Sequence, residues 1–316
     1  MKKIIYLSII YLSVAKLVAQ QDPQYSLYQF NQMAINPAYA GARECLAVVM
    51  DMRKQWVGFS GAPTTVDLTV HSPILNNKVG LGLNIFSDKI GAKSVTGIYG
   101  NFAYIAKLNN NLKLSFGLRA GYLNYNFNFS KVNYKDENET TVSDNAKTNG
   151  GNLDLDAGLF LKSNSFFAGL SITHLNNAVL YNANYTVTPT GSATPVFYNS
   201  NYQLNSHLFF VIGKSFAVNE NFLISPSFML KSVSTVQTVD FNLNFFLNKR
   251  VWLGVFIRQD YGLGFLAQFY ATDKFRIGYA YDTGVGSKKV LRSSHEIMLG
   301  FDFNKHQSKS VTPRFL

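Results

Sequence analysis

The chain has 316 residues, enough for one large domain or two ordinary ones. Only 15% of the residues are charged, whereas a typical soluble protein has about 25%, and another 15% are aromatic. The net charge is +11, but the basic residues are scattered along the chain rather than clustered, which argues against nucleic acid as a partner.

The first residues, MKKIIYLSIIYLSVAKLVAQQ, have the layout of a signal peptide. Two lysines precede a mostly apolar run over residues 4–15, and small residues end near Ala19. We therefore predict that residues 1–19 are a signal peptide for export; the alternative is a buried N-terminal strand or helix. The run is too short to cross a bilayer as a helix, and no later segment offers about 20 apolar residues, so we expect no transmembrane helix.

The next segment contains NQMAINPAYAGAR over residues 31–43, which fits neither a strand nor a helix. It lacks alternation, and proline after Asn36 disfavours helix there. Its amide, tyrosine and arginine side chains need polar partners if they are buried. We predict that residues 20–43 form a periplasmic or lumenal plug segment, either a structural latch or a docking site. Its candidate residues are Phe30, Met33, Asn36, Pro37, Tyr39, Gly41 and Arg43.

Residues 44–304 show a period of two. In residues 112–122 and again in residues 275–281, large apolar residues alternate with polar or small ones, and about fourteen such segments follow one another. Tight turns at residues 109–111, 163–164, 219–221, 248–249 and 272–273 alternate with connections that are often longer, at residues 87–94, 130–151, 176–201 and 283–293. This alternation of short and long connections is typical of an outer-membrane barrel.

The pattern predicts an all-β transmembrane outer-membrane β-barrel of about 14 antiparallel strands, with both ends on the periplasmic side. Several segments run ten residues or more, as a tilted membrane strand needs, whereas the strands of the alternative, a periplasmic or surface β-sandwich, are usually shorter. Aromatic residues near strand ends would form interfacial girdles. These are Trp56, Tyr104, Tyr122, Trp252, Tyr270 and Tyr281.

The polar face of the strands would line the barrel lumen. Charges of both signs occur on it, and unpaired charges in a narrow lumen would be costly, so we expect paired charges and a filled lumen rather than a wide pore. The expected inward charges are Asp51, Arg53, Asp67, Lys113, Arg119, Asp154, Asp156, Asp240, Arg276, Asp282, Glu296 and Asp302. In the first strands, Gln55, Trp56 and Pro63 are further candidate site residues.

Residues for catalysis or metal binding show no recognisable spacing. The five histidines form no metal-type pair, the lone Cys45 can form no internal disulfide, and no nucleophile-elbow motif is present. We therefore expect no catalytic residue, no metal and no cofactor. The long polar connections at residues 130–151 and 181–200 are candidate partner-binding loops, or idle solvated ones.

Several short motifs together resemble the PorP/SprF family of type IX secretion system outer-membrane proteins of Bacteroidetes. The resemblance rests on QDPQYS at residues 21–26, Phe30, Met33, NPAYAG at residues 36–41, Arg53, QW at residues 55–56, Gly58 and APTT at residues 62–65. The chain also ends in PRFL, and we expect residues 305–316 to be a periplasmic tail containing Pro313, Arg314 and Phe315.

The resemblance implies a non-enzymatic component of the secretion and gliding machinery. Its expected partners are a large secreted adhesin-like protein, bound through its C-terminal secretion domain, other type IX secretion components such as the periplasmic ring, and outer-membrane lipid. One alternative is a plugged outer-membrane transporter for small or hydrophobic solutes. Another is an outer-membrane enzyme such as a lipase.

Overall fold

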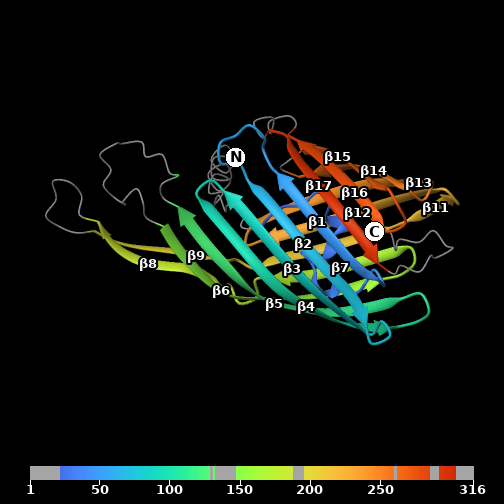
Figure 1. Cartoon of the computed structure of the whole chain (residues 1–316), viewed down its shortest axis with the longest axis horizontal. Helices are drawn as coiled ribbons and strands as arrows, with labels where there is room; N and C mark the ends of the chain where they lie inside the picture. Colours follow the sequence, from blue (N-terminus) through green and yellow to red (C-terminus); the bar gives the residue numbers. More distant parts are fainter. Residues whose placement is uncertain are drawn as a thin grey trace, which may run out of the picture.

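The computed structural model describes residues 22–128, 131, 147–187, 196–259, 262–284 and 292–303, and these form an antiparallel β-barrel (Figure 1). The wall strands in chain order are β1 (Leu46–Lys54), β2 (Thr64–Ile74), β3 (Val79–Ile90), β4 (Lys93–Lys107), β5 (Lys113–Asn128), β6 (Lys147–Lys162), β7 (Phe166–Thr173), β10 (His207–Lys214), β12 (Phe222–Val233), β13 (Val236–Leu247), β14 (Val251–Arg258), β15 (Gly262–Tyr270), β16 (Phe275–Thr283) and β17 (Ser294–Phe303).

The sheet closes on itself. β1 pairs with both β2 and β17, and β10 pairs with both β7 and β12, so the ladder of hydrogen bonds returns to its start. The described residues form a 15-stranded sheet, of which β11 (Phe216–Asn219) only continues β10 along the same neighbour, β12. Fourteen strands therefore make the ring, which confirms the predicted all-β barrel and rules out an open sandwich.

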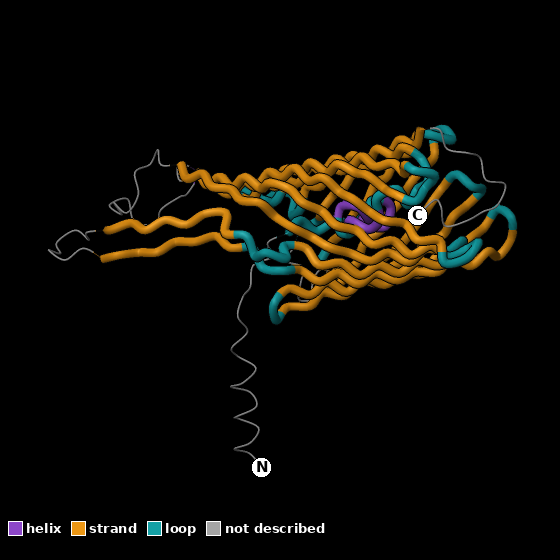
Figure 2. Tube along the Cα trace, turned by 90° about the horizontal axis from the view of Figure 1, so that it is seen from below, coloured by secondary structure: helices purple, strands orange, loops and turns teal. Residues whose placement is uncertain are grey.

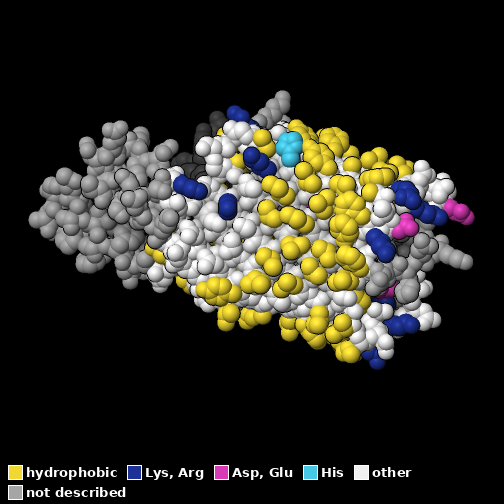
Figure 3. Space-filling view, viewed as in Figure 1, with side chains coloured by type: hydrophobic (Ala, Val, Ile, Leu, Met, Phe, Trp, Pro, Cys, Tyr) yellow, Lys and Arg dark blue, Asp and Glu magenta, His cyan; other side chains and the backbone are white. Residues whose placement is uncertain are grey.

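The faces of the wall are those of a membrane barrel rather than of a soluble protein. Along β4, Phe102 and Tyr104 are exposed while Tyr99, Asn101 and Ala103 are buried. The same alternation on the other strands leaves a broad apolar band on the outside (Figure 3). Such a band around a closed barrel is typical of a wall that faces lipid. Within the described residues, no helix has the length and hydropathy that a bilayer crossing requires.

The two ends of the barrel differ. At one end, here called the turn end, short connections such as residues 75–78 and 163–165 join the strands, and both the start of β1 and the end of β17 lie there. At the opposite end, the loop end, lie the longer connections. The connection from β7 to β10 carries the hairpin of β8 (Val179–Val187) and β9 (Val196–Gln203), which projects far beyond the wall (Figures 1 and 2).

The predicted aromatic girdle is partly wrong. Tyr104 and Tyr122 face outward, but Trp252 and Tyr270 are buried in the lumen, where Trp252 stacks on Phe246 with 4.5 Å between ring centroids. A one-residue shift in strand register reverses the face of every side chain, and an aromatic ring suits either face. Trp56 does not lie on the first strand, because β1 ends at Lys54 and Trp56 follows it with a positive φ of 47°.

Three predicted loops contain strand residues. The connection predicted at residues 87–94 is mostly the end of β3 and the start of β4, with only residues 91–92 between them. Residues 176–201 hold the β8–β9 hairpin, and β6 begins at Lys147, inside the predicted loop of residues 130–151. Tyrosine and valine in these stretches favour strands despite the polar composition. The predicted signal peptide, most of residues 129–146, His306, and the tail with Pro313, Arg314 and Phe315 lie outside the described residues.

The N-terminal segment lies inside the barrel (Figure 2). It contains three short 3-10 turns, η1 (Tyr28–Phe30), η2 (Gln32–Ala34) and η3 (Pro37–Tyr39). The side chain of Asn36 caps η3 by accepting a hydrogen bond of 2.9 Å from the backbone N–H of Ala38, with proline at the first position, where its missing N–H is not needed. This local chemistry explains why residues 31–43 fit neither a long helix nor a strand.

Candidate functional site

The N-terminal segment fills the lumen from one end to the other. Asp22 contacts His174, next to the end of β7 at the loop end, whereas Arg43 contacts Asp302 near the end of β17 at the turn end. Between these contacts the segment is almost wholly buried. Its buried apolar residues are Leu27, Tyr28, Phe30, Met33, Ile35, Ala38, Tyr39 and Ala40.

Aromatic contacts hold the middle of the segment against the wall. The ring of Phe30 lies 6.0 Å from that of Trp252, and the ring of Tyr39 meets Phe160 edge-on at 5.1 Å, both measured between centroids. Met33 is fully buried. These contacts place Phe30, Met33 and Tyr39 in the packing positions that a plug requires.

Glycines in the wall let the backbone of the segment approach very closely. A Cβ atom built on Gly80 would lie 2.0 Å from the carbonyl oxygen of Ala40, and one on Gly117 would lie 2.1 Å from the backbone nitrogen of Ala38. Both distances are far below van der Waals contact. The inward side chains of β3 and β5 therefore have to be absent at these two positions for the segment to fit.

The substitution Gly117→Ala is expected to destabilise the barrel by about 1–3 kcal/mol, because the added methyl group overpacks the lumen and pushes on the backbone of η3. Gly100→Ala is the matched control, since a Cβ there meets only the oxygen of Ala120 at 4.0 Å. The free energy of unfolding in urea, measured on both purified variants, checks this. Equal stability of the two variants would show that the segment does not press on β5.

Buried charges pair across the half of the lumen nearer the loop end. Arg53 on β1 donates to Glu296 on β17 at 3.0 Å and to Asp282 on β16 at 2.8 Å. The Glu296 carboxylate also accepts the backbone N–H groups of Ser26 and Leu27, at 2.7 and 2.8 Å. One carboxylate thus bonds both the wall and the N-terminal segment. It also links β17 to β1, the two strands whose pairing closes the barrel.

Asn31 links the segment to the next layer of the wall. Its side-chain nitrogen donates to Asp51 at 2.8 Å and to Asp67 at 3.1 Å, and its oxygen accepts a hydrogen bond from the Thr69 hydroxyl at 2.8 Å. Asp67 also accepts a hydrogen bond from Asn84. A single amide therefore bridges two buried carboxylates that face each other in the β1–β2 register.

Nearer the turn end, further polar contacts hold the N-terminal segment to the wall. Arg43 donates to both carboxylate oxygens of Asp302, at 3.1 and 2.7 Å, and Arg276 reaches the same carboxylate at 2.8 Å. The backbone N–H of Gly41, whose φ is +77°, donates to Nδ1 of His71 at 3.1 Å. Such bidentate, fully buried contacts fix the direction in which the segment enters β1.

Two further contacts fix η2 and η3 against β5 and β6. Asn36 donates to the carbonyl of Leu159 at 3.0 Å, and Arg119 donates to the carbonyl of Ala34 at 3.1 Å while pairing with Asp156. The charges predicted to point inward are thus mostly buried and paired. Lys113 is paired with Glu44 but is only partly buried, at the turn end. Asp51 and Asp67 are buried and hydrogen-bonded, but among the described residues they have no ion pair.

Of the candidates in the first strands, Asp51, Arg53 and Asp67 join the lumenal network, whereas Gln55, Trp56 and Pro63 do not. These three belong to the connection from β1 to β2 at the loop end, where the backbone N–H of Gln55 donates to the carbonyl of Pro63 at 3.0 Å. The fold therefore divides the predicted site residues between the lumen and the rim.

A cluster at the loop end was not predicted. His174 bonds Asp154 through Nδ1 and Asp22 through Nε2, both at 2.7 Å, and His207 lies 3.7 Å from Asp22. Asp22, His174 and His207, or Asp154, Asp156 and His174, have the donor types of a metal site. Because both ring nitrogens of His174 face carboxylates, however, a protonated imidazole accounts for these two contacts without a metal ion.

The electrostatics of this cluster agree with a charged histidine. Burial alone would lower the pKa of His174, but the carboxylates of Asp22 and Asp154 outweigh burial and raise this pKa from 6.5 to about 10. Burial would likewise raise the pKa of Asp22, yet His174 and His207 hold it well below its usual range. At neutral pH the N-terminal end of the segment is therefore fixed by an ion pair.

Alkaline pH is expected to weaken this attachment. The folded pKa of His174 lies above its unfolded value of 6.5, so its stabilisation is complete below pH 6.5 and is lost as the pH rises toward 10, by about 1.4 kcal/mol per pH unit. Thermal unfolding midpoints measured across this range check the prediction. The control is His174→Gln, which should be less stable at low pH and nearly independent of pH over this range; parallel curves would contradict it.

Cavities along the N-terminal segment are small. The one beside Asp22, Tyr99 and Arg119 has a volume of about 40 Å³, and those beside Tyr39 and Gly41 have about 10 Å³ each. A cavity that holds a benzene ring has about 150 Å³. In this state, the spaces beside the segment hold water molecules at most.

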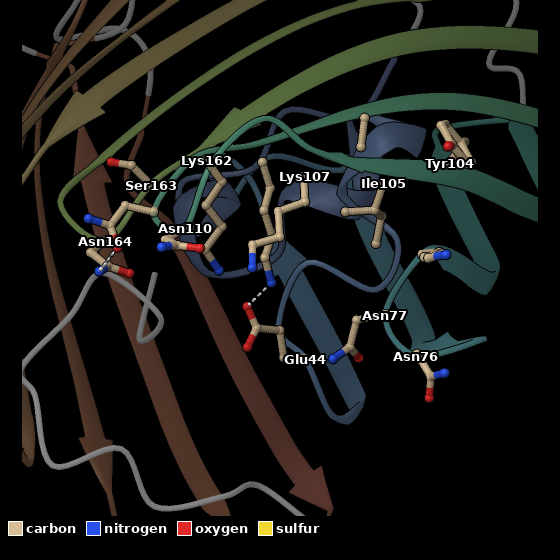
Figure 4. Close-up of a pocket in the computed structure, with 14 residues that line it drawn as sticks. Glu44, Asn76, Asn77, Tyr104, Ile105, Lys107, Asn110, Lys162, Ser163 and Asn164 are labelled. Carbon is tan, nitrogen blue, oxygen red and sulfur yellow. Dashed lines mark hydrogen bonds and ion pairs between the residues drawn. The ribbon is translucent and has the colours of Figure 1, made fainter.

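A larger pocket lies at the turn end, close to where the segment leaves the lumen (Figure 4). Its volume is about 570 Å³, and we call it the turn-end pocket. Lys113 pairs with Glu44 there at 2.7 Å, and Lys162 donates to the carbonyl of Ala42 at 2.8 Å. The lining residues are Glu44, Asn76, Asn77, Lys78, Tyr104, Ile105, Ala106, Lys107, Asn110, Asn111, Lys113, Lys162, Ser163 and Asn164.

A comparison with family models identifies the family of this barrel. The model described as type IX secretion system membrane protein PorP/SprF matches residues 17–301. The chain belongs to this family. The match includes the whole described N-terminal segment and nearly all of the wall, so the PorP/SprF resemblance predicted from short motifs is confirmed over most of the chain.

Solved structures similar to this PorP/SprF barrel are outer-membrane channels. A TodX monoaromatic hydrocarbon channel with the deltaS2 mutation is 12% identical, with a TM-score of 0.53 over 88% of this chain and 94% of that one. The Pseudomonas putida toluene transporter TodX is 10% identical, with a TM-score of 0.50 over 90% and 95%. At this identity the similarity concerns the fold alone. A search of curated proteins found no match.

Proposed function

We propose that this PorP/SprF protein is a non-enzymatic outer-membrane component that holds a secreted partner protein at the cell surface through its loop end. The observation that carries the proposal is the filled lumen. With residues 22–43 packed from end to end and only water-sized cavities beside them, the barrel offers a sealed anchor rather than a passage. Function then has to reside at the two ends.

The β8–β9 hairpin makes the loop end suitable for holding a partner. The ring of Tyr125 on β5 stacks on Tyr202 at 4.7 Å and on Tyr181 at 6.0 Å, and Lys93 donates to the hydroxyl of Tyr202 at 3.0 Å. The base of the hairpin is thus fixed to the wall, unlike an idle loop. Beyond its base the hairpin forms its own two-stranded sheet, whose edges could accept a strand from a partner.

The partner would be a large exported protein whose C-terminal domain pairs with this hairpin. An affinity purification from detergent-solubilised outer membranes, read by mass spectrometry, tests this. We expect the intact tagged barrel to retain one large exported protein, and we expect loss of that protein when residues 182–201 are replaced by a short glycine linker. A matched control alters the turn at residues 109–111, at the opposite end, and should leave the capture unchanged.

Other outcomes of this purification would favour a different function for the barrel. Capture of periplasmic proteins alone, unaffected by loss of the hairpin, would replace surface anchoring by a role in the core apparatus. Capture of no protein would favour the second candidate, a plugged transporter for small or hydrophobic solutes. That candidate draws on the fold shared with TodX, but it requires the N-terminal segment to move, because an aromatic ring needs more space than the lumen now contains.

A further inference from the structure

The turn-end pocket lies at the opposite end of the barrel from the hairpin, so its role is independent of the proposed function. We propose that this pocket binds an acidic peptide segment of a protein on the turn-end side of the membrane. The pocket of about 570 Å³ is far larger than the lumenal cavities and can take several residues of an extended chain. Filling of the lumen by the N-terminal segment does not explain why this pocket is present.

The charge of the pocket selects an anionic ligand. Four lysines and one glutamate line it, which gives a local net charge of four minus one, or +3. Lys113 is neutralised by Glu44. The exposed side chains of Lys78 and Lys107 have no hydrogen bond or ion pair within the described part of the chain, and they come from separate elements, the β2–β3 turn and the end of β4. Two positive charges thus remain available at one site.

The remaining polar groups match a peptide better than a phosphate. Asn76, Asn77, Asn110, Asn111 and Asn164 also line the pocket, and each amide offers both donors and an acceptor. A peptide backbone needs both, whereas a phosphate group only accepts. Figure 4 shows Lys107, Lys162 and Asn110 reaching toward the same space beside Glu44. An acidic segment could therefore bond the lysines with its side chains and the asparagines with its backbone.

The position of the pocket also favours a protein over a lipid headgroup. Glu44, Ile105, Lys113 and Lys162 lie on the lumenal side of the rim, next to the point where the N-terminal segment enters β1, and Lys162 bonds that segment directly. A lipid headgroup would contact the outer side of the rim, below the apolar band. Of the lining side chains, Tyr104 points to that side.

The test uses fluorescein-labelled hexaglutamate and the purified full-length barrel in an uncharged detergent, with binding followed by fluorescence anisotropy at low salt. We expect the double variant Lys78→Gln, Lys107→Gln to weaken binding about tenfold. The matched control is Lys249→Gln, Lys274→Gln, which removes the same charge from exposed turns on the opposite side of the same end and should change binding less than about twofold.

Three results would overturn the proposal. The first is unchanged binding in the pocket variant, and the second is equal weakening in both variants, which would mean a general charge effect. The third is failure of hexaglutamate to bind the intact barrel. If phosphatidylglycerol nanodiscs or inorganic phosphate then bind, and the pocket variant weakens that binding, the pocket is assigned to phosphate. Since all four lysines replaced are exposed, both variants should fold, and partner capture at the loop end should persist in each.

Discussion

Replacing Arg53 with methionine is expected to lower the free energy of unfolding by about 3–5 kcal/mol, the largest effect of any single substitution considered. Arg53 is 1% exposed and donates to Glu296, Asp282 and the hydroxyl of Ser26. Its removal leaves two carboxylates close together in the lumen without this cation, and one of them, Glu296, is fully buried. Urea-dependent unfolding of the purified barrel measures the loss.

A compensated variant separates charge from packing. Combining Arg53→Met with Asp282→Asn and Glu296→Gln removes the two stranded charges, so we expect it to recover more than half of the lost stability. If the triple variant is as unstable as the single one, the loss arises from packing around Arg53 rather than from its ion pairs. Lys54→Gln, next along β1 but exposed, is the control for strand pairing and should change stability by less than about 0.5 kcal/mol.

Removing residues 22–40 is expected to convert the sealed barrel into a solute-conducting pore. The segment occupies the lumen along its length, and the wall that remains carries both apolar rings, such as Trp252, and many charged and polar side chains that water can hydrate. Liposome swelling with small sugars and conductance across planar bilayers measure the change. We expect no solute flux through the intact protein and rapid flux through the deletion variant.

A synthetic peptide of residues 20–43 controls for indirect effects of the deletion. If the lumen is sealed by this segment, added peptide should lower the conductance of the deletion variant, whereas a scrambled peptide should not. The heat-modifiable mobility of the variant in gels reports whether the barrel has assembled. Equal flux through intact and deleted barrels would reject the sealed-anchor interpretation and support the transporter.

The wall of this barrel could be predicted from sequence because each strand carries a local signal. A period of two, tight turns and strands of ten or more residues are visible without knowing any partner. Which face of the wall carries a given aromatic side chain could not be predicted. Trp252 and Tyr270 fit the strand pattern on either face, and the N-terminal segment, through contacts such as that of Phe30 with Trp252, makes the lumen an apolar environment for them. Aromatic rings suit both places.

A lumenal position for residues 31–43 could be predicted from polar side chains that need buried partners, but the path of the N-terminal segment through the barrel could not. The cluster of Asp22, His174 and His207 requires that β7 pairs with β10 and that the segment reaches the loop end. Neither fact has a local signature, since the residues are far apart in the chain. The turn-end pocket is similar, because its lysines come from the β2–β3 turn and from the ends of β4, β5 and β6, which the pairing of these strands brings together.

The contact between the N-terminal segment and Glu296 sets an order of assembly. Ser26 and its partner are 270 positions apart, and Arg43 and Asp302 are 259 apart. The N-terminal segment therefore cannot form these contacts until the C-terminal strands are present. Contacts of such high sequence separation form slowly. Pairing of β17 with β1 both completes the ring and supplies these carboxylates. A chain truncated before β17 would thus lose the closing strand and two of the anchoring points of the N-terminal segment together.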